Sequence, residues 1–135
     1  KGLLAIAAVI DVALHDRGRP VSAKTLAVRH ALPARHLGPV LQALVRDGIL
    51  KGVRGPRGGY ELARDRKKIS ADDILRAAGT IQEDGEAGRT GSALLKEVVG
   101  PAVGQAEKTF SLALSRISVE DLAKKAEPFR DSPGG

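Results

Sequence analysis

The stretch that decides the fold is residues 49–63, which read ILKGVRGPRGGYELA. Two short apolar runs, 49–53 and 60–63, flank a turn made of glycine, proline and arginine. A two-residue apolar period predicts strands, and glycine with proline between two such runs predicts a tight turn. We therefore expect a β-hairpin with a basic tip.

Two segments with helical periodicity begin the chain. Apolar residues of the first recur at intervals of three and four, and they are Leu3, Ile6, Ala7, Ile10, Ala13 and Leu14. Residues 18–20, Gly-Arg-Pro, are expected to end this helix. In the second segment Ser22 is a good N-cap and Val21 can staple onto Leu26, so a short helix is expected to about His30.

A third helix is expected to follow the turn at residues 32–33, with Pro33 in its first position. Its inward stripe is predicted to be Leu37, Val40, Leu41, Leu44 and Val45. Gly48 is expected to end it as a left-handed cap. The order helix, helix, turn, helix, strand, basic loop, strand is that of a winged helix-turn-helix domain, which we predict for residues 1–79.

The rest of the chain is also predicted to be mainly helical. Ser70, preceded by Ile69, is expected to cap a fourth helix that ends near Gly79. Residues 80–100 are predicted to be an exposed loop with a short helix. A long helix and a final helix to about Ala126 are predicted within residues 101–127, followed by a flexible tail at 128–135. The fold class is therefore mainly α with a small two-stranded β wing.

The long helix carries a narrow apolar seam whose members are spaced three, four, three, four, like a coiled coil. They are Val103, Ala106, Phe110, Ala113 and Ile117. The seam could pack on its own domain or pair with the same helix of a second chain. The first four helices are expected to close the core without it, which favours a homodimer.

Composition excludes several classes of protein. The 135 residues suit one compact domain with an extension. Without a cysteine there are no disulfides, thiolate metal sites or cysteine nucleophiles. The longest apolar run, residues 3–10, is shorter than the roughly 18 residues of a membrane span. A cytoplasmic, nucleoid-associated protein without membrane contact is expected.

Charge is divided unevenly between the two halves of the chain. Residues 1–68 hold 14 basic and 5 acidic residues, whereas residues 69–135 hold 8 basic and 11 acidic ones. A basic half of this kind indicates a polyanionic partner, although it can also be no more than a solvated surface.

Basic and polar residues fall on the elements with which a winged helix faces DNA. An exposed helix fits the major groove, and a thin glycine-rich hairpin can bring arginine to the minor groove. The predicted DNA-binding residues are Lys24, Thr25, Arg35, His36, Gln42, Arg54 and Arg57. A further basic cluster follows the second strand, at Arg64, Arg66, Lys67 and Lys68.

The segment 53–64, VRGPRGGYELAR, resembles the wing of the Rrf-two (Rrf2) family of bacterial transcriptional regulators. Lys1-Gly2, residues 11–14 and residues 37–50 match that family as well. The resemblance implies a dimeric regulator, expected to be a repressor, that binds an imperfect palindrome in double-stranded DNA. It implies that Arg54 is the wing arginine and that Arg35, Gly38 and Pro39 occupy base-facing positions.

Two departures from the family change what the resemblance implies. Redox-sensing members hold an iron–sulfur cluster through three cysteines in the loop before the long helix, and this chain has none. We therefore expect no cofactor and no metal site. Gly38 and Pro39 replace polar side chains and cannot hydrogen-bond a base edge, so the operator should differ from those of other members. The residues do not identify a small-molecule effector and leave such a ligand open.

Other functions fit the residues less well. His15, His30 and His36 fall in separate elements without metal-ligand spacing, and no lysine with serine or threonine follows the wing glycines as in a phosphate loop. We therefore expect no enzyme. An RNA-binding module would use aromatic stacking platforms, but the chain has one tyrosine and two phenylalanines. A winged-helix module for protein contacts is the remaining alternative.

Overall fold

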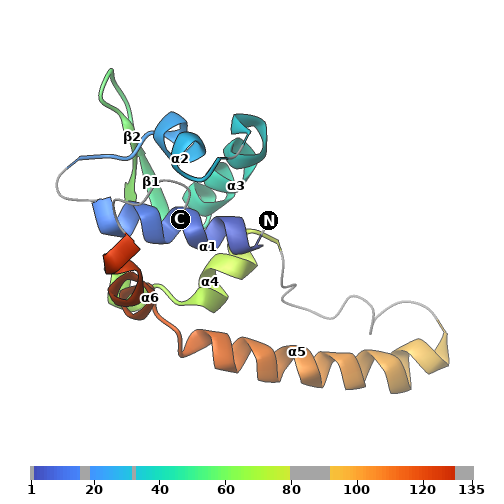
Figure 1. The fold of residues 1–135 in the computed structure, drawn as a ribbon. Coiled ribbons are helices and arrows are strands. Elements are labelled where there is room, and N and C mark those ends of the chain that lie inside the picture. Colours follow the sequence, from blue (N-terminus) through green and yellow to red (C-terminus); the bar gives the residue numbers. More distant parts are fainter. Residues whose placement is uncertain (1, 16–18, 32, 80–91, 130–135) are drawn as a thin grey trace.

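The structure is a computed structural model that describes residues 2–15, 19–31, 33–79 and 92–129. Three helices, a two-stranded sheet and four further helical segments follow one another along the chain, with short 3-10 turns between or after them. The α2, α3 and wing elements lie on one side of α1, and α4 and α6 on the other (Figure 1). Helix α5 extends away from this body. The predicted fold class is confirmed.

Helix α1 (Gly2–His15) is the centre of the fold. Its buried positions, among them Ala5, Val9 and Val12, face α3, α4 and α6. Small side chains here let the neighbouring elements approach closely. Leu3 belongs to the predicted apolar periodicity but is 85% exposed, although Gly2 beside it is buried and Leu4 packs against the core.

Helices α2 (Ala23–Arg29) and α3 (Ala34–Arg46) form the helix-turn-helix pair. As predicted, Ser22 caps α2 by accepting a hydrogen bond from the Thr25 N–H at 3.0 Å. Pro33 is the N-cap of α3 and not its first residue, so that its extended backbone precedes the helix. The turn between the helices passes through Ala31, whose φ of 51° is unusual for a residue with a Cβ.

The stripe predicted for α3 is largely confirmed. Leu37, Val40, Leu41 and Leu44 are buried, whereas Val45 lies at the edge of the stripe and is 37% exposed. The helix ends as expected, with Gly48 at a φ of 74°. This left-handed backbone turns the chain into the hairpin.

The wing consists of β1 (Leu50–Val53) and β2 (Gly59–Leu62), paired antiparallel with Leu50 opposite Leu62. It is fastened to the chain before α2 by two backbone hydrogen bonds. The Val21 N–H donates to the Tyr60 carbonyl at 2.9 Å, and the Tyr60 N–H donates to the Val21 carbonyl at 2.8 Å. This pair fixes the wing beside α2.

The end of the chain returns to the winged domain. A 3-10 turn, η1 (Arg66–Lys68), leads into α4 (Ala71–Ala77), and α6 (Val119–Ala126) packs against α1 and η1. The capping boxes of α4 and α6 are built on Ser70 and Ser118, both predicted as N-caps. Because Val119 and Ala123 are buried in the common core, four helices do not close it alone, and the predicted boundary that groups α6 with the dimerisation helix is wrong.

Helix α5 (Gly100–Ser115) follows a π-helical turn, η3 (Leu95–Val99). Pro101 lies in the first turn of α5, and the helical backbone continues into it without a break, since Val99 is itself helical. Residues 80–91 of the predicted loop lie outside the described residues. The predicted tail begins later than expected, because η4 (Glu127–Phe129) is a 3-10 turn, and residues 130–135 lie outside the described part.

Two positions of the wing accept only glycine, because neighbouring backbone atoms leave no room for a Cβ. A Cβ at Gly59 would collide with the Val21 carbonyl, and one at Gly58 would collide with the Val53 carbonyl. By contrast, a Cβ at Gly52 in β1 would meet no atom within 4 Å. The Gly-Gly pair of the sequence therefore allows the wing to close and to dock.

We expect Gly59→Ala to lower the free energy of unfolding by about 1–3 kcal/mol, the usual cost of overpacking. The matched control is Gly52→Ala, which should change it by less than about 0.5 kcal/mol. Urea denaturation followed by circular dichroism measures both. Equal stability of the two variants would mean that the wing does not dock closely on Val21.

Candidate nucleic-acid interface

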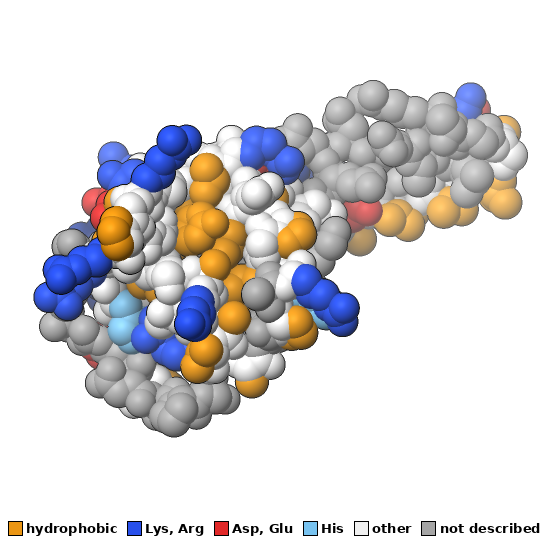
Figure 2. Space-filling model, turned by 90° about the horizontal axis from the view of Figure 1, so that it is seen from above, with side chains coloured by type: hydrophobic (Ala, Val, Ile, Leu, Met, Phe, Trp, Pro, Cys, Tyr) orange, Lys and Arg blue, Asp and Glu red, His pale blue; other side chains and the backbone are white. Residues whose placement is uncertain are grey.

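The face formed by α2, α3 and the wing carries most of the residues predicted to bind DNA. Arg35 and His36 are exposed on the first turn of α3, and Gln42 is exposed further along it. Figure 2 shows the side of the molecule on which these elements lie. Lys and Arg side chains are distributed around this face, and few Asp or Glu side chains are visible on it. This face therefore brings together the exposed residues that the sequence predicts to bind DNA.

The other predicted residues lie at the start of α2 and in the wing. Lys24 and Thr25 are exposed in the first turn of α2. Arg54 and Arg57 are exposed on the two sides of the turn that joins β1 to β2. All seven predicted residues are therefore accessible on neighbouring elements, and their contact with DNA stays a prediction.

The proline within α3 has a defined consequence. Pro39 is exposed and has no N–H, so the carbonyl of Arg35 receives no hydrogen bond from it. The helix nevertheless runs without a break from residue 34 to residue 46. Gly38 and Pro39 present little polar side-chain surface, which leaves Arg35, His36 and Gln42 as the polar side chains of this helix that can contact bases.

Two arginines of the basic cluster after the second strand, Arg64 and Arg66, make contacts within the protein. Arg66 donates from Nε to Glu120 of α6 at 2.5 Å, and this hydrogen bond is the main cause that lowers the pKa of the Glu120 carboxyl below its ordinary value. Arg64 donates to the Gly48 carbonyl at 3.2 Å and lies 3.9 Å from Asp73. Both arginines thus have partners inside the protein, although their side chains stay about 40% exposed, and their contact with DNA stays a prediction.

A buried carboxylate that the sequence analysis missed sets the orientation of α2. The side chain of Asp11 in α1 is 5% exposed. Arg29 of α2 donates from Nε and Nη2 to its two oxygens, both at 2.9 Å, and His30 Nε2 lies 2.9 Å from Oδ2. In the same helix, His15 Nδ1 lies 2.9 Å from the Asp11 carbonyl oxygen. A bidentate pair of this geometry fixes both position and angle.

The sequence held a signal for this contact. Asp11 is the only charged residue in the apolar run 3–14, and a charge in a buried helix face requires a partner. His15 and His30, for which the sequence showed no metal-ligand spacing, both lie beside this aspartate. None of the His, Asp and Glu residues that the structure describes form a group of three or more able to hold a metal ion.

Comparison with known proteins identifies the family. A profile of the Rrf2 family, described as iron-dependent transcriptional regulators, matches residues 1–125. The chain belongs to the Rrf2 family. The regulator IscR of Xenorhabdus nematophila is 30% identical over 132 residues, which cover 94% of this chain and 79% of that protein. Family membership groups the chain with transcriptional regulators rather than enzymes.

Other relatives match over less of their length. IscR of Serratia proteamaculans is 34% identical over 77 residues, 57% of this chain and 47% of that protein. The chain thus spans about half the length of several curated relatives that it matches. Among solved structures, T. potens IscR has a TM-score of 0.72 at 30% identity and covers 97% of this chain and 88% of that one. CymR, the global cysteine regulator of B. subtilis, shares the fold at a TM-score of 0.69 and 24% identity, covering 92% of this chain and 93% of that one.

The iron in the family description does not fit the residues present. A cluster bound in the way of the redox-sensing members needs thiolates, and the 135 residues contain no cysteine. The described His, Asp and Glu residues form no alternative ligand group. Within the same described residues, no helix is both long enough and apolar enough to span a membrane.

We expect Asp11→Asn to lower the free energy of unfolding by about 2–3 kcal/mol, because Arg29 and His30 lose their charged partner. This loss of stability is smaller than the roughly 3–5 kcal/mol typical of a fully buried ion pair, because Arg29 and His30 are partly exposed and can be hydrated in the variant. Asp47→Asn is the matched control, since its pair with Arg46 is exposed and contributes below about 0.5 kcal/mol. Thermal unfolding followed by circular dichroism compares the variants, and an Asp11 variant as stable as the control would contradict the anchoring role.

Proposed function

We propose that this protein is a sequence-specific transcriptional regulator that binds a palindromic operator in double-stranded DNA as a homodimer. Helix α3 would enter the major groove and the wing the adjacent minor groove. Occupying an operator that overlaps a promoter would repress transcription. The protein would act in the cytoplasm, on the nucleoid, without an iron–sulfur cluster.

The observation that carries this proposal is the common face of α3 and the wing. Arg35 and His36 on the helix and Arg54 on the hairpin are all exposed, and the docking of Val21 on Tyr60 fixes the hairpin relative to the helices. Arginine can make a bidentate bond to guanine in the major groove, and it is attracted to the narrow minor groove. Membership of a family of transcriptional regulators supports the same conclusion.

The homodimer is supported by the surface of α5. Val103 is 49% exposed, Phe110 54% and Ile117 38%, and Ala106 and Ala113 between them are exposed as well. Another side of the helix faces its own domain, where Ser111 is buried and accepts a hydrogen bond from Arg76 of α4 at 2.9 Å. A continuous apolar stripe of this kind marks an interaction surface. Pairing of two copies by a two-fold axis would present two α3 helices to two half-sites.

Arg54→Ala is expected to weaken operator binding by about 1–3 kcal/mol and to relax sequence preference next to the half-site. Selection of bound fragments from the host genome first supplies the operator, and gel shifts then compare the variants. The control is Lys125→Ala, an exposed cation on α6, which lies across α1 from α2 and α3 (Figure 1). Unchanged operator affinity in Arg54→Ala would contradict the role of the wing.

Phe110→Asp is expected to convert the dimer into monomers, because it places a charge in the centre of the apolar stripe. Sedimentation velocity measures the change directly. Lys108→Asp alters charge on the opposite side of α5, two residues away, and should leave the dimer intact. A dimer that survives Phe110→Asp would show that another surface joins the two copies.

A further inference from the structure

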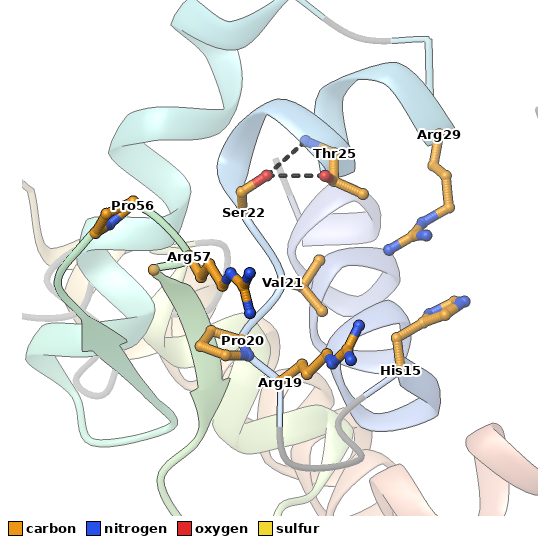
Figure 3. Close-up of a pocket in the computed structure, with 10 residues that line it drawn as sticks. His15, Arg19, Pro20, Val21, Ser22, Thr25, Arg29, Pro56 and Arg57 are labelled. Atoms are coloured by element: carbon orange, nitrogen blue, oxygen red, sulfur yellow. Dashed lines mark hydrogen bonds between the residues drawn. The ribbon is translucent and has the colours of Figure 1, made fainter.

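A cavity of about 910 Å³ lies between the end of α1, the start of α2 and the wing. Figure 3 shows that the segment before α2 and the hairpin form two of its walls. Three arginines from separate parts of the chain line it, Arg19 before α2, Arg29 in α2 and Arg57 in the wing. The wing therefore forms a polar cavity together with α2, in addition to exposing basic side chains at its tip.

The positive charge of the cavity comes mainly from two of these arginines. Arg29 is paired with the buried carboxylate of Asp11, which balances its charge. Arg19 and Arg57 have no acidic partner within 4 Å among the residues that the structure describes. Both side chains line the cavity near Val21, Arg57 from the side of the wing and Arg19 from the segment before α2 (Figure 3). A cavity lined by guanidinium groups without an acidic partner among the described residues attracts anions.

A hydroxyl group adds a hydrogen-bond donor to the same wall. The Ser22 hydroxyl donates to Thr25 Oγ1 at 2.8 Å while its oxygen accepts from the Thr25 N–H. Since Thr25 Oγ1 acts as the acceptor, its own proton is available to another acceptor. Guanidinium groups and a hydroxyl donor together are the donor set that binds phosphate oxygens.

We propose that this cavity holds a phosphate group of the DNA strand that separates the major groove from the minor groove. The inference rests on the proposed function, since a duplex with α3 in one groove and the wing in the next must carry that strand between them. Arg57 then contacts the backbone and not the base edges, which leaves Arg54 as the wing residue that reads the minor groove. Arg19, which the sequence did not single out, becomes a phosphate ligand beside it.

The test compares Arg19→Gln with the wild-type chain in duplex binding at several salt concentrations, followed by fluorescence anisotropy. Loss of one phosphate contact should reduce the slope of log K against log salt by about 0.9 and weaken binding roughly fivefold to tenfold at 0.1 M salt. The weakening should be equal on operator and random duplexes, because a backbone contact carries no sequence information. Arg57→Gln should behave in the same way, whereas Arg54→Gln should affect the operator more than the random duplex.

Lys125→Gln, with the same change of charge on α6, is the control and should keep the wild-type slope. Melting curves should match for all variants, because Arg19 and Arg57 are exposed and make no ion pair with the described residues. An unchanged slope in Arg19→Gln, or a loss confined to the operator, would overturn the phosphate assignment. Failure of the wild-type chain to bind any duplex would instead overturn the proposed function, and this inference with it.

A free phosphorylated molecule would offer the same chemistry, so a second arm tests that source. The DNA-free protein is titrated with inorganic phosphate in a calorimeter, at constant ionic strength set by chloride. No saturable binding with a dissociation constant below about 1 mM is expected. Saturable submillimolar binding that Arg19→Gln abolishes would assign the cavity to a small anion and overturn the DNA assignment. Absence of such binding together with a reduced salt slope supports the strand phosphate.

Discussion

The surface proposed to bind DNA depends on one pair of backbone hydrogen bonds, the reciprocal bond between Val21 and Tyr60. It joins the start of the helix-turn-helix unit to the second strand of the wing. The pair is possible only because Gly59 has no side chain at the point where the two backbones meet. Without it, the base of the hairpin would still be held by Leu50 and by the packing of β2 on α1, but the hydrogen-bonded link between the wing and the start of α2 would be lost.

A second anchor acts at the other end of α2. The Asp11 carboxylate receives two hydrogen bonds from Arg29, so α2 is fixed to α1 at its C-terminal end and to the wing at its N-terminal end. The start of α6 adds a third connection. The Val119 N–H donates to the Ile69 carbonyl and the Ala71 N–H donates to the Ile117 carbonyl, which joins the chain after the wing to the chain after α5.

The sequence predicted the elements well because local rules determine them. Ser22, Ser70 and Ser118 cap helices where their spacing to the following residues requires it, and Gly48 takes the left-handed conformation that ends α3. The hairpin follows from apolar alternation around glycine and proline. The resemblance to the Rrf2 family, carried by the wing, is confirmed by the match to residues 1–125.

What the sequence did not provide depends on contacts between distant residues. Arg66 and Glu120 are 54 positions apart, and only the return of α6 to the domain shows that Glu120 holds the Arg66 side chain. In the same way, Arg19 and Arg57 share a cavity only because the wing docks before α2. The exposure of Leu3 was missed because helical periodicity gives the spacing of an apolar face but does not show which residues at its edge reach the core.

The central claim is that one cationic face, built from α2, α3 and the wing, binds double-stranded DNA. It is tested most directly by titrating the full chain into a labelled random duplex and into single-stranded RNA of equal length, at increasing salt. The account predicts a duplex dissociation constant of about 10⁻⁴–10⁻⁶ M near physiological salt, a steep loss with added salt, and weaker binding to the RNA. No duplex binding even at low ionic strength, or a preference for the RNA, would contradict it.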